Sequence, residues 1–265
     1  MQVILTSPRS ELGGIVARRV AEDPRPDDPS RVVINVALQA PNSLLHDGHT
    51  WKRYPPDRLL RETRDAVRRA QDADFLVHAS YVLAGAPEAG IAVGEQLQPI
   101  IDATLEAESM VLAGGVAACV LRLGYLYGPE SRNLKAYRRA FRIGRPYWAG
   151  RDDVQQRFLH TEDAATALLL AATQRPSGRL RSATDQQPVS FASFMDHFAK
   201  LVGNPLPLHL PAFMAPVSRI IIAAEHMQMV EVPTAAIPRL PSPRGFRPAF
   251  PRYRAGLRQV VDAWG

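Results

Sequence analysis

Cysteine is almost absent from this chain of 265 residues, and no long apolar run occurs in it. The one cysteine, Cys119, excludes a disulfide framework within the chain, so we expect a reducing compartment, the cytoplasm. No run approaches the ~18–20 apolar residues of a membrane span. The first residues enter a strand-like run without a preceding basic segment, so no signal peptide is expected.

Lysine is scarce as well, and arginine supplies most of the positive charge. Lysine occurs only at positions 52, 135 and 200, whereas the formal net charge is +6. This skew, together with abundant alanine and proline, is typical of a GC-rich bacterial genome. Because most of the arginines are scattered, the charge favours a solvated surface over nucleic-acid binding. We expect a small-molecule or protein partner and no membrane, and we leave an oligomer open.

Short apolar runs alternate with helix-like segments, the pattern of an α/β protein with parallel strands covered on both faces. The strand-like runs cover residues 2–6, 31–38, 74–79 and 117–123, and the helix-like segments cover 11–22, 57–72, 95–114, 131–143, 161–174, 188–203, 212–228 and 252–263. We expect Thr161 or Asp163 to cap the helix at 161–174, and Ser190 to cap the helix at 188–203. The pattern predicts a core over 1–190 with a helical insertion at about 130–150. A C-terminal lobe over 191–265 shares part of that core.

Five segments match one family in order and spacing. They are VVINVAL (32–38), VHASYVLAG (77–85), TLEAESMVLAGGVAACVLRLGYLYGP (104–129), RFLHTEDAATALLLAA (157–172) and FRPAFPRYRAGLRQVVDAW (246–264). Together they resemble the extended short-chain dehydrogenases/reductases of the NAD-dependent epimerase/dehydratase-like kind. The resemblance implies a Rossmann-like, doubly wound parallel sheet that binds NAD(P), with a substrate lobe at the C-terminus. It also implies a catalytic Ser/Thr, Tyr and Lys, in which the Tyr exchanges a proton with the substrate during hydride transfer.

The loop after the first strand departs from this family. Residues 6–13, TSPRSELG, lie where the family has T-G-x-x-G-x-x-G, and Gly13 alone remains of the three glycines. Glycines there allow a tight turn and let a diphosphate approach the backbone, whereas Pro8 lacks an N–H and Glu11 would repel an anion. We interpret the loop as vestigial. Its candidate cofactor contacts are Thr6, Ser7, Arg9, Ser10 and Gly13. In the alternative, Arg9 and the serines bind phosphate in place of the glycines.

A stretch of the standard core is missing after the first helix. The run at 31–38 resembles the fourth strand of the family, and the 45-residue step from Asn35 to Ser80 fits the spacing from the fourth strand to the fifth. In the alternative, 31–38 is the second strand. We expect the second and third strands to be missing, and with them the residue that reads the adenine ribose. We therefore expect no bound cofactor, or NAD(P) if the loop still binds.

The Tyr and Lys of the family's catalytic set have no counterparts. The resemblance places Thr104 at the Lys position and Ile100 at the Tyr position, and no lysine occurs from 53 to 134. A phenol titrates near ~10 and needs a nearby cation to exchange protons at neutral pH. The usual proton relay is therefore not expected. Ser80, which matches the family's Ser, and Tyr81 are the catalytic candidates that remain.

Further side chains fall at the carboxyl ends of the strand-like runs, where open α/β sheets form their ligand crevice. We predict that the crevice is lined by Asn35, Arg122, Tyr125, Tyr127 and His160. Structural interpretations favour a buried pairing for Arg122 and a core position for His78. His46 and His49 lie close together in the sequence but lack a further His or Cys group, so no metal site is predicted.

These observations leave three hypotheses. The favoured one is a degenerate family member that has lost NAD(P)-dependent redox catalysis and acts as a binding, structural or ligand-sensing protein. The second is an atypical NAD(P)-dependent oxidoreductase or epimerase, in which Tyr81 or Tyr125 replaces the missing acid. The third is a cofactor-independent isomerase or lyase that uses Ser80, Tyr81 and His160.

Overall fold

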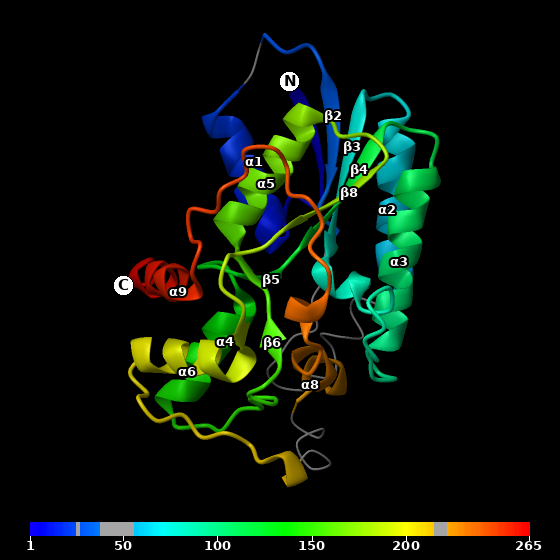
Figure 1. The fold of residues 1–265 in the computed structure, drawn as a ribbon. Helices are drawn as coiled ribbons and strands as arrows, with labels where there is room; N and C mark the ends of the chain where they lie inside the picture. Colours follow the sequence, from blue (N-terminus) through cyan, green and yellow to red (C-terminus); the bar gives the residue numbers. More distant parts are fainter. Residues whose placement is uncertain (25–26, 38–55, 215–221) are drawn as a thin grey trace.

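The computed structural model describes residues 1–24, 27–37, 56–214 and 222–265. A five-stranded parallel sheet forms its centre, in the order β1-β2-β3-β4-β8 (Figure 1). The strands are β1 (Gln2–Thr6), β2 (Arg31–Asn35), β3 (Phe75–Tyr81), β4 (Ala118–Leu123) and β8 (Arg179–Ala183). The three central strands are almost fully buried, which explains their continuous apolar runs. His46 and His49 lie outside the described residues.

Helices cover both faces of the sheet (Figure 1). On one face lie α1 (Glu11–Glu22) and α5 (Thr161–Gln174), which bury Val16 and Leu168 against the alternate strand residues Ile34 and Val77. On the other face lie α2 (Pro56–Ala70) and α3 (Gln98–Ala113), which pack on the opposite set of strand side chains. The alternation of side chains along each strand thus produces two separate cores, one on each face.

The connections around β2 have opposite hands. The steps from β1 to β2 and from β2 to β3 move in the same direction across the sheet, yet α1 and α2 lie on opposite faces. Right-handed connections are nearly universal, so the first step is the unusual one. In the complete Rossmann sheet, the second and third strands lie on the outer side of the first. A right-handed connection through α1 would end on that same side of β1. In the described part of the chain no strand pairs there, which confirms that these two strands are missing and identifies β2 with the fourth.

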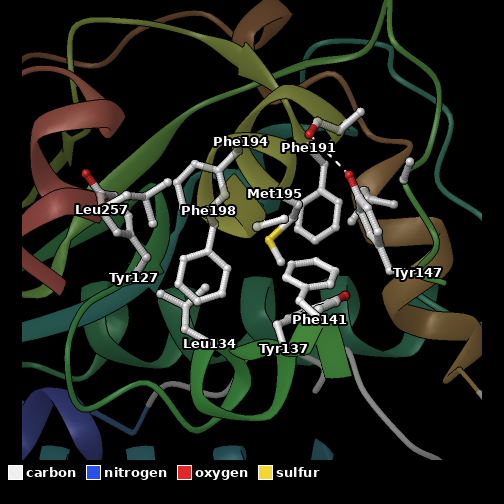
Figure 2. Close-up of a cluster of buried hydrophobic side chains, with 14 of the residues drawn as sticks. Tyr127, Leu134, Tyr137, Phe141, Tyr147, Phe191, Phe194, Met195, Phe198 and Leu257 are labelled. Atoms are coloured by element: carbon white, nitrogen blue, oxygen red, sulfur yellow. Dashed lines mark hydrogen bonds between the residues drawn. The ribbon is translucent and has the colours of Figure 1, made fainter. Parts of the chain in front are cut away.

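The C-terminal lobe has an aromatic core of its own (Figure 2). Phe158 stacks on Phe194 with ring centroids 4.0 Å apart, and Tyr147 donates a hydrogen bond to the Ala192 carbonyl over 3.2 Å. This core draws on residues 125–160 as well as on the predicted lobe at 191–265, and from here on all the elements around it are called the lobe. They are β5 (Tyr125–Tyr127), α4 (Arg132–Arg142), β6 (Gln155–Gln156), β7 (Phe158–His160), β9 (Val189–Ser190), α6 (Phe191–Leu201), α8 (Ala224–Val230) and α9 (Tyr253–Asp262). Short 3-10 helices cover Val82–Gly85, Ala212–Met214 and Thr234–Ala236. These elements position the ends of β3 and β4 against the segment 229–240.

Two details of the helices differ from the prediction. The side chain that caps α5 is His160 rather than Thr161 or Asp163, because Asp163 accepts hydrogen bonds from two backbone N–H groups at 249–250 instead. The continuous helix predicted over 212–228 is also wrong, since its described residues form a 3-10 turn and then a helix that begins at 224. Ser190 caps α6 as predicted. No helix in the described ranges has both the length and the apolarity that crossing a membrane requires.

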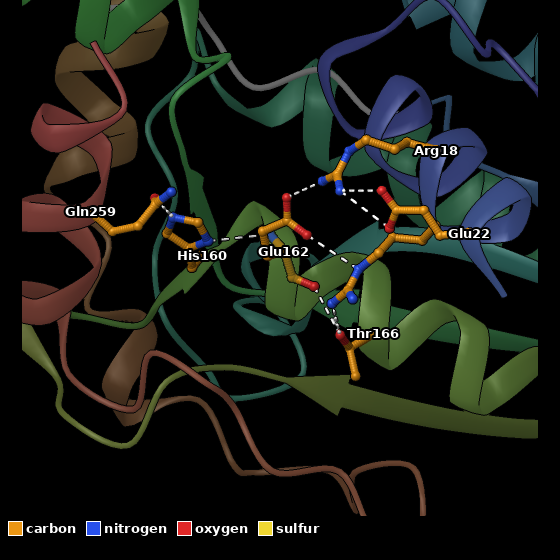
Figure 3. A network of polar contacts seen from close by, with 7 residues as sticks. Arg18, Glu22, His160, Glu162, Thr166 and Gln259 are labelled. Atoms are coloured by element: carbon orange, nitrogen blue, oxygen red, sulfur yellow. Dashed lines mark hydrogen bonds and ion pairs between the residues drawn. The ribbon is translucent and has the colours of Figure 1, made fainter. Parts of the chain in front are cut away.

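Polar contacts join α1 to α5 at the edge of the lobe (Figure 3). Glu162 pairs with Arg18 and with Arg19, the latter over 3.2 Å. His160 accepts the Glu162 N–H at Nδ1 over 3.2 Å and contacts Gln259 of α9 at Nε2 over 3.0 Å. Burial lowers the pKa of His160 to about 4, so the ring is neutral and its Nε2 donates to Gln259.

Candidate functional site

The loop between β1 and α1 keeps the turn of a glycine-rich loop. Ser7 has φ 51°, a left-handed conformation that glycine adopts without strain. The Ser10 N–H donates to the Ser7 carbonyl over 3.0 Å, and the Ser10 hydroxyl accepts the Gly13 N–H over 3.0 Å. A Cβ at Gly13 would lie 2.2 Å from the Ser7 carbonyl oxygen. The closed turn therefore survives the replacement of two glycines by serine.

The first turn of α1 holds a carboxylate at the place where a diphosphate would bind. Glu11 accepts the backbone N–H of Arg132 over 3.1 Å, at the start of α4. Burial raises the pKa of Glu11 despite that hydrogen bond. The loop thus combines a suitable backbone turn with a side chain that competes with an anionic ligand, while Arg9 is exposed beside it.

Three neighbouring strands end in one chain of hydrogen bonds. Thr6 donates to Asn35 Oδ1 over 2.6 Å, and Asn35 Nδ2 lies 2.9 Å from Nδ1 of His78. Burial lowers the pKa of His78 to about 4, so the imidazole accepts this hydrogen bond as a neutral ring. Asn35 and His78 are buried. The predicted crevice residue Asn35 therefore serves to join β1, β2 and β3.

Ser80 is held in a buried network of ion pairs. Its hydroxyl donates to Glu108 over 2.5 Å, and Glu108 also pairs with Arg122 over 2.6 Å. Arg122 continues to Glu88 over 3.0 Å. Burial by itself would lower the pKa of Arg122, but its hydrogen bonds to the two carboxylates outweigh this and raise it. Ser80 and Arg122 therefore have structural partners. The third hypothesis requires a Ser80 hydroxyl that is free to act on a substrate, whereas this hydroxyl is already bound to Glu108.

The positions of the missing Tyr and Lys lie beside a pocket at the carboxyl edge of the sheet. Ile100 forms part of the pocket wall, whereas the Thr104 hydroxyl donates to the Ile100 carbonyl one helical turn away over 2.6 Å. The pocket encloses about 470 Å³ together with its open mouth. Other lining residues are Tyr81, Leu83, Leu123, Tyr125, Arg157 and Met229. The site is thus mainly apolar, with two phenols in its wall.

The remaining predicted residues divide between this pocket and the core. Tyr125 lines the pocket, and burial raises its pKa well above the usual value, so its phenol stays protonated. Tyr127 and His160 are fully buried and pack edge to face, with ring centroids 5.2 Å apart. Neither lines the pocket. In the described part of the chain, no group of three or more His, Cys, Asp or Glu side chains could hold a metal ion.

Several lining residues escaped the sequence analysis. Met229 and Thr234 come from a proline-rich stretch that carries no motif, and Arg157 precedes a strand of only three residues. Their contribution depends on the segment 229–240 lying across the ends of β3 and β4. The proline density predicts an irregular path there, but it does not show where the path leads.

Known proteins resemble the chain in sequence and in fold. A 3-diazoavenalumate denitrifying reductase from a Streptomyces species is 32% identical over 203 residues, 71% of this chain and 66% of that protein. Human epimerase family protein SDR39U1, solved with NADPH, has a TM-score of 0.69 at 14% identity, over 99% of both chains. UDP-glucose 4-epimerase of Thermus thermophilus, solved with NAD, has a TM-score of 0.65 at 15% identity, over 99% of this chain and 98% of that one. No family model matches.

The sheet order and the matches in fold define a Rossmann-like α/β protein. Within that class, the chain shares its fold with proteins of the extended short-chain dehydrogenase/reductase family and is similar in sequence to a reductase. The alignment with the curated reductase spans 66% of that protein's length.

Proposed function

We propose that the chain is an NAD(P)-dependent reductase that acts on a substrate needing hydride but no proton from the protein. The observation that carries the proposal is Ile100 in the pocket wall, at the position where the family has its acidic phenol. The relative at 32% identity is named as a reductase, which supports hydride chemistry in this chain as well.

The chemistry of a diazo substrate fits a pocket without a proton donor. Reduction of a carbonyl group leaves negative charge on oxygen, so a protein acid must supply a proton. Reduction of an arenediazonium ion differs: hydride forms a C–H bond, the C–N bond breaks, and its electron pair leaves with N₂. Charge balances without any proton. An apolar wall of Ile100, Leu83 and Leu123 then suffices, because its task is to orient an aromatic ring and exclude water.

The residues present fit part of a nicotinamide dinucleotide. The turn at Ser7 and Ser10, with Gly13 behind it, leads backbone N–H groups at the start of α1 toward a diphosphate. A bound nicotinamide would supply the hydride. The adenosine end lacks the second strand on which the family holds it, and Glu11 competes for the anion. We therefore expect weaker cofactor binding than in a complete family member.

Turnover with a labelled cofactor tests the proposal. The purified chain is mixed with NADPH or NADH deuterated at the transferable position and with a diazo arene, either benzenediazonium or 3-diazoavenalumate. We expect loss of absorbance at 340 nm above the rate without protein, and deuterium at the carbon that carried nitrogen. Ile100→Trp should abolish this by filling the pocket, whereas the exposed Ile143→Trp should not. Equal rates with and without protein would contradict the proposal.

A second candidate is a binding protein that no longer performs redox chemistry. It is favoured by the missing outer strands and by the carboxylate of Glu11 at the start of α1. Calorimetry separates the two candidates. Binding of an aromatic ligand without measurable binding of NADPH or NADH up to millimolar concentration would support the second and exclude the first.

A further inference from the structure

A second pocket adjoins the first one and differs from it in charge. The two pockets share Val82 and Arg157 as lining residues, so they lie next to each other. The second encloses about 250 Å³ together with its mouth, between the end of β8 and the segment 237–240. Its polar lining consists of Arg122, Arg157, Arg239, Ser182 and Thr184. An apolar chamber thus lies beside a cationic one.

Arg157 is a buried cation that forms no salt bridge with the residues that the structure describes. The residue is only 8% exposed to solvent. Its Nη2 donates hydrogen bonds to the carbonyls of Ala235 and Ile237, over 2.7 and 3.3 Å. Its Nε is buried and has no hydrogen-bond partner among the described residues. A buried charge is costly unless it is paired. Burial, followed by the proximity of Arg239, lowers the pKa of Arg157.

The carboxylates nearby form no ion pair with these two arginines. Glu108 and Glu88 are both bound to Arg122, which is therefore satisfied. Burial raises the pKa of Asp185, which follows Thr184, to about 8, although the charge of Arg239 acts in the opposite direction. Within the described ranges no salt bridge joins Arg157 or Arg239 to a carboxylate. An anion bound between these two guanidinium groups would relieve their repulsion and fill the unmet donor.

We propose that this second pocket binds the carboxylate of an aromatic carboxylic acid whose ring occupies the first pocket. The assignment rests on the proposed function, since it names the substrate class for that same site. A guanidinium group presents parallel N–H donors that match the two oxygens of a carboxylate. The hydroxyls of Ser182 and Thr184 already donate to the carbonyls of Leu240 and Asp185, over 2.9 and 3.1 Å. The arginines therefore supply the recognition.

Binding without any cofactor tests this assignment. Calorimetry compares trans-cinnamate with cinnamamide, which has the same ring and nearly the same shape but no charge. We expect the acid to bind about tenfold more tightly or better, as charged hydrogen bonds allow. Arg239→Gln should remove most of that preference. Arg247→Gln changes another exposed arginine, further along the chain, that lines neither pocket, and it should leave the preference intact.

Arg157→Lys provides an independent check. It retains the charge but loses Nε and the two-pronged geometry, so we expect a partial loss of preference with the thermal unfolding midpoint as a control for folding. Equal binding of acid and amide, or equal effects of Arg239→Gln and Arg247→Gln, would overturn the assignment. Because no cofactor or diazo group is present, failure of the hydride assay alone would sink the proposed function and leave this result unaffected.

Discussion

The two sides of the crevice differ in how completely they are built. On the nucleotide side, β1 forms the edge of the sheet, with one residue exposed and four partly buried. On the substrate side, the pocket is backed by the aromatic core around Phe158, Phe194 and Tyr147, all fully buried. The missing strands therefore lie on the side that would hold adenosine. The elements that shape the pocket are well packed, which supports the proposal that the chain binds a ligand there.

The largest effect is expected in the aromatic core. Phe194→Ala removes a ring stacked on Phe158 and should lower the free energy of unfolding by about 3–5 kcal/mol. Val3→Ala at the partly exposed edge strand should cost less than about 1 kcal/mol. Urea unfolding of both variants checks this. Similar losses in the two variants would mean that the two sides do not differ in packing.

The buried ion pair of Glu108 with Arg122, which lines the second pocket, comes next. Glu108→Ala leaves Arg122 with Glu88 alone and should cost about 3 kcal/mol. Replacing both members of the pair, Glu108→Leu with Arg122→Met, should recover much of that loss. Glu106→Ala, on the exposed face of the same helix, is the control and should change the free energy by less than about 0.5 kcal/mol. A small effect of Glu108→Ala would show that water reaches Arg122 and replaces the lost carboxylate.

The pH dependence of stability tests whether both sides unfold together. His78 in the sheet and His226 in the lobe are buried, and burial lowers their pKa values to about 4 and about 3. The unfolded chain binds protons near pH 6.5, so stability is complete above that pH. It should fall by about 1.4 kcal/mol per histidine for each unit below 6.5, until the folded pKa is reached. His226→Phe should flatten the slope. Separate sheet and lobe transitions below pH 6 would show that the two sides unfold independently.

The smallest effect on stability is expected in the loop between β1 and α1. A variant in this loop also tests whether the loop binds a nucleotide. Ser7→Gly relieves the left-handed strain but loses the Ser7 hydrogen bond to Glu62, so stability should change by less than about 1 kcal/mol. We expect it to raise the affinity for NADPH because the backbone becomes more accessible. Ser7→Ala is the matched control, since it loses the same hydroxyl and keeps the strain. Identical NADPH affinities for the two variants would argue against a diphosphate at this turn.

Much of the sheet could be predicted because each buried strand is a continuous apolar run with a recognisable spacing. The spacing from Asn35 to Ser80 also indicated the missing strands. The hand of the first connection could not be predicted, because it depends on which face α1 covers. The side chain of His160 was not expected as a cap, since imidazole rarely has that role. That Arg157 and Arg239 line the same pocket could not be predicted, because it depends on the path of a proline-rich segment without periodicity.

Because of its unusual first connection, this fold is suited to the insertion of the missing strands from a complete relative. A strand–helix–strand insert from a complete relative, placed between Glu22 and Arg31, would start on the face where α1 ends. It could pair along the side of Gln2–Thr6 on which no described strand lies. Such a chimera would have only right-handed steps around its first strand. It would restore an adenosine platform to the protein without altering any residue of the apolar or the cationic chamber.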